Sequence, residues 1–508
     1  MKFLRPFSHL QPGRFQRHMI VALVTTSLVS TLGWGKTAQA QTAPYCQLSA
    51  TEIAQTAALR QAAIQGDRTA QNRYRALVTQ HATAMRQCRR QSWLQNQAIW
   101  LRLYPCDVRP GALEEILDNV VSRGYSQVYV EVFANGQVLL PQSDNNTSWV
   151  SIVRAPGYGD RDLLAEAIAK GRERGLQVYA WMFTMNFGYT YSQRPGADQV
   201  LARNGTGHTS LNFRTDAGLN ADFGSVNSDE TFIDPYNIRA KQDYYALVQA
   251  IARRRPDGVL FDYIRYPRGT GAASVASRVS DLWIYGSAAQ NALYERALNQ
   301  SGRELIRRFI SRGYITASDV SSVNSLYPQD GEPLWQGLNP NGNTAITSEQ
   351  AQPYLQQELW RLSVAHAIQG VLDFLGMSIL PVQRQGITAG AVFFPDGNLA
   401  IGRGYDSRLQ PWDRFPSNIE WHPMSYAICG TPDCIVAQVQ RVFSQAPGGT
   451  KIMPVLAGTW GQAANGRPSL EAQMQAIHQA VPQVSSISHF AYSWQFPQAD
   501  QQRKFCRL

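Results

Sequence analysis

From residue 97 to the carboxyl terminus, short apolar runs that are typical of buried strands alternate with amphipathic stretches that are typical of helices. The strand-like runs are apolar on both faces, as expected for parallel strands that helices cover. They lie at 98–104, 127–133, 176–184, 259–262, 387–394, 418–427, 451–456 and 487–495. Eight such repeats predict an α/β fold of the (β/α)8 TIM-barrel class. An open, doubly wound sheet is the alternative, but no glycine-rich phosphate loop follows an early strand.

Two segments lie outside this alternation. Residues 41–95 are rich in Ala, Gln and Arg and carry apolar residues at helical spacing on both sides of a break at Gly66 and Asp67. This pattern predicts an N-terminal helical hairpin that packs on the barrel domain, 96–508, although it could also be a spacer or a partner surface. Residues 268–350 interrupt the alternation after the fourth strand, and a connection of this length indicates an insertion beside a site.

The first 40 residues have the three parts of a secretory signal peptide. A basic region precedes an apolar run at 19–32, and the small residues around Ala38 and Ala40 form a cleavage site. We expect cleavage after Ala40 and a secreted or periplasmic protein; an uncleaved anchor is the alternative. No later run is long and apolar enough to predict a membrane span after cleavage.

The chain has six cysteines, and an even number in an exported protein favours disulfides. We expect Cys429 to pair with Cys434 across a short loop, and Cys46 with Cys88 across the N-terminal helices. Cys106 and Cys506 would remain, and they follow the first and last strands, which become neighbours when a barrel closes. Free buried thiols are the alternative.

The charge pattern argues against a nucleic-acid partner. The formal net charge is +10, but the acid-free residues 1–40 supply half of it, and the rest of the chain has no dense Lys/Arg patch. The sequence also has neither an HExxH-type metal spacing nor a nucleophile elbow. We therefore expect no metal and no cofactor.

The most informative stretch is PDGVLFDYIRYPR at 256–268, which contains the fourth strand. It ends with a carboxylate, Asp262, followed by Tyr263 and Arg265. The chemistry of α/β barrels lies where the strands end, so an acid at this position predicts a site. The alternative is that Asp262 only pairs with Arg265 to hold a loop.

Other strand ends add acids and aromatic residues. Carboxylates protonate or attack a glycosidic bond, and aromatic rings stack on sugars. The candidate catalytic acids are Asp262, Glu131, Asp396 and Glu420. The candidate sugar-binding residues are Tyr263, Arg265, Trp181, His422, Tyr426, Trp460 and Trp494.

Several of these residues have a structural alternative. Glu131 could equally be the buried partner of an arginine, and Glu420 lies early in its strand, which favours an inner-layer role. Asp396 belongs to a PDGN turn signature. His422 could be a hydrogen-bonded core histidine, and the tryptophans could be core residues.

Three segments resemble the glycosyl-hydrolase-like family 10 proteins. They are DGVLFDYIRYP at 257–267, SQVYVEVFANGQVLLP at 126–141, and the pair PWDRF and IEWHPMSY within 411–426. The resemblance implies a carbohydrate-active barrel with Asp262 at its centre, and Glu131, Glu420 and Tyr426 also carry over by position. Glu420 stands where the family usually has aspartate, and the order Trp412-Asp413 is reversed relative to the family.

These observations support an exported glycoside hydrolase that cleaves a polysaccharide or oligosaccharide through paired carboxylates. The rival hypothesis is a non-catalytic glycan-binding protein on a decayed hydrolase barrel. A third is a scaffold that uses residues 41–95 to bind a protein partner.

Overall fold

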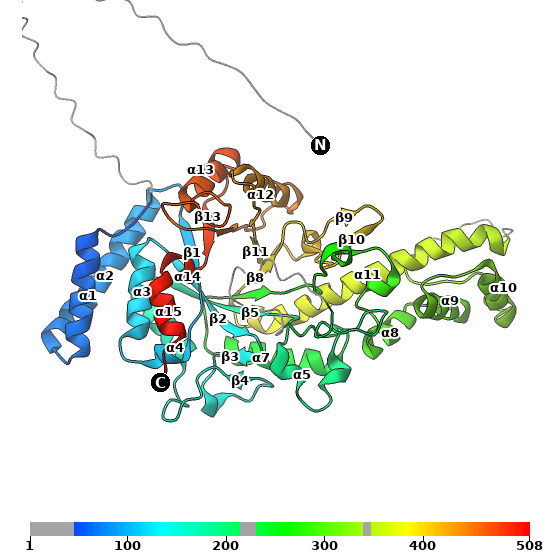
Figure 1. Ribbon diagram of the computed structural model, residues 1–508, viewed down its shortest axis with the longest axis horizontal. Coiled ribbons are helices and arrows are strands. Elements are labelled where there is room, and N and C mark those ends of the chain that lie inside the picture. Colours follow the sequence, from blue (N-terminus) through cyan, green and yellow to red (C-terminus); the bar gives the residue numbers. More distant parts are fainter. Residues whose placement is uncertain (1–44, 214–229, 339–346) are drawn as a thin grey trace, which may run out of the picture. The chain divides into compact units, whose positions relative to one another are not determined.

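The computed structural model describes residues 45–213, 230–338 and 347–508. The expected signal peptide, and parts of the loop after the third strand and of the insertion, lie outside the described residues. Figure 1 shows the strands at the centre, between helices.

Eight parallel strands follow one another around a ring in sequence order, which confirms the predicted TIM barrel. They are β1 (Asn96–Leu101), β2 (Gln127–Ala134), β5 (Gln177–Phe183), β6 (Gly258–Asp262), β8 (Thr388–Phe393), β11 (Glu420–Pro423), β12 (Val455–Ala457) and β13 (Ser486–Phe490). Parallel bridges from Trp421 to Ile452 and from Met424 to Val455 join β11 to β12 and close the ring. The predicted strand at 487–495 ends early, because a short helix begins at Tyr492.

Helices cover the outside of the ring after most strands. They are α3 (Ala112–Ser122), α4 (Leu163–Glu173), α7 (Ile238–Ala252), α11 (Ser348–Gln383), α12 (Asp433–Gln445), α13 (Leu470–Ala480), and α14 (Tyr492–Gln495) with α15 (Pro497–Lys504). The fifth repeat differs, because β8 and β11 are joined by β9 (Ala400–Ile401), β10 (Gly404–Asp406) and a 3-10 turn at Trp412–Arg414. The regular alternation therefore breaks once, beside the insertion strand β7 (Val275–Ala276), which pairs with β10.

Aromatic side chains fill the inside of the barrel. The ring of Trp100 meets those of Tyr129 and Trp181 edge-on, with centroids 5.0 and 4.9 Å apart. The Trp100 indole N–H donates to the Ser488 hydroxyl at 3.1 Å, which satisfies its one polar atom inside the core. The strands therefore enclose a packed core, and ligands must bind at the ends of the barrel.

The predicted N-terminal hairpin consists of α1 (Ala50–Ile64) and α2 (Arg68–Arg90), which pack beside α3 (Figure 1). Asp67 begins α2 by accepting hydrogen bonds from the backbone N–H groups of Thr69 and Ala70. The Cys46–Cys88 disulfide joins the start of this segment to the end of α2. The hairpin is thus held to the barrel helices along its length.

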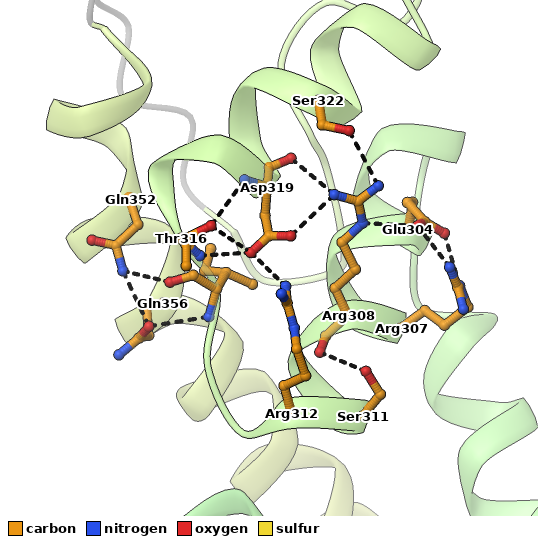
Figure 2. A network of polar contacts seen from close by, with 11 residues as sticks. Glu304, Arg307, Arg308, Ser311, Arg312, Thr316, Asp319, Ser322, Gln352 and Gln356 are labelled. Carbon is orange, nitrogen blue, oxygen red and sulfur yellow. Dashed lines mark hydrogen bonds and ion pairs between the residues drawn. The ribbon is translucent and has the colours of Figure 1, made fainter.

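The insertion after β6 is mostly helical, with α8 (Ser287–Tyr294), α9 (Gln300–Arg312) and α10 (Ala317–Leu326). Figure 2 shows that Asp319 of α10 faces Arg308 and Arg312 of α9. Burial alone would raise the pKa of Asp319. The hydrogen bonds that Asp319 forms with Arg312, Thr316 and Arg308 instead hold this pKa well below its usual range. The network joins α9 to α10, and α10 packs on the first half of α11.

The expectation that no later run is long and apolar enough to cross a membrane was wrong for one described helix, α11, which has 36 residues. Its most apolar 18-residue window is 61% buried inside the protein. The helix packs against α7 and β8, so its apolar residues belong to the core of the barrel.

All three expected disulfides are present, namely Cys46–Cys88, Cys106–Cys506 and Cys429–Cys434. The second joins the residues after β1 to the carboxyl terminus, 400 positions away. Beside it, Arg503 of α15 donates to both carboxylate oxygens of Asp107 at 2.9 and 2.7 Å.

We expect the double substitution Cys106→Ser/Cys506→Ser to lower the free energy of unfolding by about 5 kcal/mol, because the disulfide closes a long loop in the unfolded chain. Urea denaturation measures this effect. The matched control is Cys429→Ser/Cys434→Ser, which opens a loop of only five residues and should have a smaller effect. Equal losses from the two variants would contradict the loop-closure explanation.

Candidate functional site

Asp262 is the last residue of β6, at the carboxyl end of the strand, and its side chain is buried. The chain reaches this point through Val259, Leu260 and Phe261, which are fully buried and carry the strand through the barrel wall. The backbone carbonyl of Asp262 accepts from the N–H of Thr184 at 2.7 Å, which continues the pairing with β5 beyond its last residue. The carboxyl group is therefore placed by two neighbouring strands.

Two donors hold the Asp262 carboxyl group. The indole N–H of Trp181, on β5, donates to Oδ2 at 3.1 Å, and the backbone N–H of Tyr263 donates to Oδ1 at 2.6 Å. Burial raises the pKa of Asp262 to about 6, and the charge of Glu131 adds to this, although both donors and Arg265 act in the opposite direction. A carboxylic acid with this pKa can hold a proton near neutral pH and donate it to a reacting group.

Tyr263 follows Asp262 in a left-handed backbone conformation, with φ at +53°. This conformation is uncommon for a residue with a bulky side chain, and such strained residues cluster at active sites and ligand clamps. The Tyr263 ring lies 4.2 Å from that of Phe183 and 4.5 Å from the Arg265 guanidinium, measured between centres. Arg265 also lies over Phe232, at 5.4 Å, so aromatic rings surround a cation beside the carboxyl group.

Glu131 lies in β2, where the pairing register with β5 shifts between Glu131 and Phe133. Such bulges redirect side chains and are frequent next to active sites. Arg102, directly after β1, donates to both Glu131 oxygens at 2.7 Å. Glu131 therefore has the arginine partner considered in the sequence, and it is also close enough for its charge to raise the pKa of Asp262.

A pocket of about 100 Å³ lies beside Trp181. Its walls include Trp100, Arg102, Phe490 and, from the carboxyl-terminal helix, Asp500. Typical ligand pockets measure about 300–1,000 Å³, so this volume suits one substituent of a ligand. Aromatic and charged groups from β1, β13 and α15 thus meet beside Trp181.

The structure brings part of the predicted set together. Asp262, Tyr263, Arg265 and Trp181 are in contact, and the charges of Glu131 and Asp262 interact. Tyr426 follows the carboxyl end of β11, with its ring centre 6.1 Å from that of Phe490, and burial and then the charge of Asp262 raise its pKa well above the usual value. These six residues come from four strands or their ends.

Glu420 and His422 lie elsewhere. Glu420 is the first residue of β11, at the amino end of the barrel, whereas Asp262 is the last residue of its strand. Its carboxylate lies 3.5 Å from the ring of the fully buried His422 and 3.9 Å from Lys451. Burial alone would raise the pKa of Glu420, but His422 and Lys451 lower it. This pair fits the inner-layer structural role.

Asp396 and the two remaining tryptophans have other surroundings, although Arg408, the partner of Asp396, lies over the same Phe394 ring as Arg265. Asp396 lies in the turn after β8, where Arg408 contacts it at 3.0 Å. Trp460 packs behind the strands, where its indole N–H donates to the Tyr125 hydroxyl at 3.1 Å and its ring meets that of His489. Trp494 is half-buried in α14, just after β13.

The sequence interpretation missed several residues of this site. Arg102, Trp100 and Phe490 lie at or near the ends of β1 and β13, so their position relative to the strands was the available signal. Phe232 comes from the long loop after β5, and no sequence pattern marked it. Among the described residues, no group of three or more His, Cys, Asp or Glu side chains is placed to hold a metal ion.

The raised pKa of Asp262 predicts the pH dependence of any reaction in which it donates a proton. We expect kcat/KM to fall as the pH rises through about 6, because the donor is then lost. A pH–rate profile on the wild-type protein measures this limb. A rate that instead rises through the same pH range would show that the ionised carboxylate is the active form.

Comparison with known proteins gives matches in structure alone. No protein-family model matches the chain, and no curated protein matches it. The glycoside hydrolase domain of PgaB (BpsB) from Bordetella bronchiseptica is similar, with 14% identity, a TM-score of 0.45, and coverage of 81% of this chain and 99% of that one. A GH18 chitinase from Pseudoalteromonas aurantia has 9% identity and a TM-score of 0.35, covering 78% of this chain and 94% of that one. The GH20 modules of the pneumococcal exo-β-D-N-acetylglucosaminidase StrH have 11% identity and a TM-score of 0.38, with 80% of each chain covered.

Proposed function

We propose that this protein is an exported glycoside hydrolase that cleaves a glycosidic bond of a polysaccharide at the carboxyl end of the barrel. The observation that carries the proposal is the buried Asp262 carboxyl group, whose pKa is raised to about 6 beside Trp181 and Tyr263. Glycosidases need one carboxylic acid that holds a proton near neutral pH, and aromatic rings to bind the sugar. The resemblance of 257–267 to the glycosyl-hydrolase-like family 10 signature supports the same assignment.

The residues have separate roles in this proposal. Asp262 donates its proton to the leaving oxygen as the glycosidic bond breaks, and a water molecule, the co-reactant of hydrolysis, forms the new bond to the sugar carbon and releases a proton. Glu131 supplies a negative charge that stabilises the oxocarbenium-like transition state, and Arg102 orients its two oxygens. Trp181 lines the small pocket that would take a sugar substituent, and Arg265 lies over the ring of Tyr263 and fixes its position.

Export is part of the proposal. The three disulfides are compatible with an oxidising compartment outside the cytoplasm. Amino-terminal sequencing of the protein recovered outside the cytoplasm tests the expected cleavage after Ala40.

The activity test is incubation of the protein with a panel of polysaccharides, with detection of new reducing ends. Hydrolysis of at least one glycan, and its loss in Asp262→Asn, would support the proposal. If no glycan that the protein binds is cleaved even after long incubation, the hydrolase proposal is wrong.

A non-catalytic glycan-binding protein is the second candidate. The bidentate contact from Arg102 favours it, because this contact engages both oxygens of the second carboxylate. In that case glycans bind without cleavage, and binding persists in Asp262→Asn. Affinity electrophoresis in glycan-containing gels separates the two outcomes.

A further inference from the structure

Arg265 differs from the other four arginines that are buried in the part of the chain that the structure describes. Arg60, Arg174 and Arg408 each form an ion pair with at least one carboxylate. Arg467 donates two hydrogen bonds to one backbone carbonyl oxygen. Arg265 is only 7% exposed, yet among the described residues no carboxylate forms an ion pair with it. A buried charge without a counter-charge is unfavourable, so its presence at the mouth of a barrel indicates a functional role.

The guanidinium group of Arg265 also has unused hydrogen-bond donors. A guanidinium group carries five N–H donors. Nη1 donates to the backbone carbonyl of Tyr266 at 3.0 Å, and residues 45–213, 230–338 and 347–508 provide no other acceptor for this side chain. The rings of Tyr263, Phe232 and Phe394 lie 4.5, 5.4 and 5.8 Å from its central carbon. Ring faces attract a cation but offer no oxygen acceptor, so the remaining donors suit an acceptor from a ligand.

This cation lies beside the candidate proton donor. Arg265 follows β6 directly, and its charge lowers the pKa of Asp262. Glu131, the other acid, is already paired through both oxygens with Arg102 at 2.7 Å. In the proposed mechanism Asp262 carries a proton and is uncharged. Of these four side chains, Arg265 then remains the one whose charge is not balanced.

We propose that the substrate is an acidic glycan, and that Arg265 binds a carboxylate or sulfate group on a sugar next to the cleaved bond. The inference rests on the proposed function, because Asp262 marks the position of that bond. Guanidinium groups bind anionic oxygens in pairs, through parallel N–H donors. A neutral glycan would leave the charge of Arg265 unbalanced, so Arg265 determines specificity.

Binding to pairs of glycans that differ in charge tests this inference. The probes are polygalacturonate, alginate and hyaluronan, each beside its methyl ester, and dextran sulfate beside dextran, which distinguishes sulfate from carboxylate. Affinity electrophoresis is run on the full chain carrying Asp262→Asn, whose amide is uncharged like the protonated acid. We expect at least one acidic probe to bind at least about tenfold more tightly than its neutral counterpart, as for a hydrogen-bonded charge pair.

Variants in the same background assign the preference to Arg265. Arg265→Gln should weaken binding of the acidic probe by about tenfold or more and change binding of the neutral probe by less than about twofold. Arg265→Lys keeps the charge but not the paired donors, so it should retain part of the preference.

The matched control is Arg123→Gln. Arg123 also lies over an aromatic ring, that of Phe496 at 5.8 Å, but it follows α3 outside the barrel. Its substitution should leave every affinity unchanged. Circular dichroism establishes that each variant is folded. If Arg265→Gln does not fold, Arg265→Lys and the comparison of acidic with neutral probes decide the outcome.

Failure of this inference can be told apart from failure of the hydrolase proposal. Equal affinity within every pair, no binding to any acidic probe, or a preference that survives Arg265→Gln would overturn the inference. Cleavage of a neutral glycan by the wild-type protein would then leave the hydrolase proposal standing. Conversely, acid-selective binding that depends on Arg265, without cleavage by the wild-type protein, would support the anion site and overturn the hydrolase proposal.

Discussion

Asp262→Asn is expected to lower kcat/KM on the cleaved glycan by about 10³-fold, because the side chain can no longer donate a proton to the leaving group. The change is small in volume, and the amide oxygen can still accept a hydrogen bond from Trp181 or from the Tyr263 backbone. Substrate binding should therefore persist, so the loss falls on kcat. Initial rates of reducing-end release measure it.

The same substitution should also make the fold slightly more stable at neutral pH. The pKa of Asp262 is about 6 in the folded protein, above the value of about 3.9 for an unfolded aspartate. Asp262 therefore contributes fully to the free energy of unfolding below about pH 4, where it is protonated. This contribution is lost as the pH rises through about 6, because the buried carboxyl group then ionises. Asparagine removes this loss, so we expect the free energy of unfolding to rise by about 1 kcal/mol at pH 7.

The matched control is Asp257→Asn, at the other end of the same strand. Asp257 precedes β6 and accepts from the Val178 backbone N–H at 2.7 Å, and Arg172 contacts it at 3.0 Å. Activity should be retained in this variant. Comparable loss in both variants would indicate that strand packing, and not the position of a proton donor, explains the result for Asp262.

Glu131→Gln is expected to lower kcat/KM by about 10²- to 10³-fold, because an electrostatic contact with the transition state is removed. It should also shift the basic limb of the pH–rate profile to lower pH. The charge of Glu131 is one of the causes that raise the pKa of Asp262, so its removal lets that pKa fall. Because the removed charge would move the limb even if Glu131 were purely structural, the discriminating measurement is kcat at a pH below the limb, which a purely structural role would leave unchanged in the folded protein.

Glu166→Gln serves as the control for this variant. Glu166 of α4 accepts two hydrogen bonds from Arg161, at 2.6 and 2.7 Å, in the same bidentate arrangement but outside the barrel. The Glu166→Gln substitution should change neither kcat/KM nor the pH–rate profile. If Glu131→Gln keeps full activity, the second carboxylate of the mechanism must be sought elsewhere.

Most of the barrel could be predicted because its strands are apolar on both faces, a pattern that only enclosed parallel strands show so regularly. The missing helix of the fifth repeat also has a local cause, since residues 395–419 are rich in turn-forming residues. Strand ends were harder to place. The predicted strand at 418–427 is a regular strand only over Glu420–Pro423, with one further bridge at Met424, which puts Glu420 at its start and away from the site.

The site itself could be predicted only where it depends on one strand. Asp262, Tyr263 and Arg265 follow from a single stretch of sequence. The pairing of Glu131 with Arg102 depends on the register between neighbouring strands and on the bulge in β2. Local amino-acid composition predicts neither of them. For the same reason, the sequence could not show whether Trp460 packs behind the barrel wall or lies at the mouth of the barrel.

The Cys106–Cys506 disulfide has a consequence for a protein exposed to proteases. It joins the residues after the first strand to the last residues of the chain, so the whole polypeptide between them is a covalent ring. One cut by a protease anywhere within that ring leaves the two pieces linked, and a fragment can be shed only after a second cut. A nicked molecule would run as one species until its disulfides are reduced, and then as two.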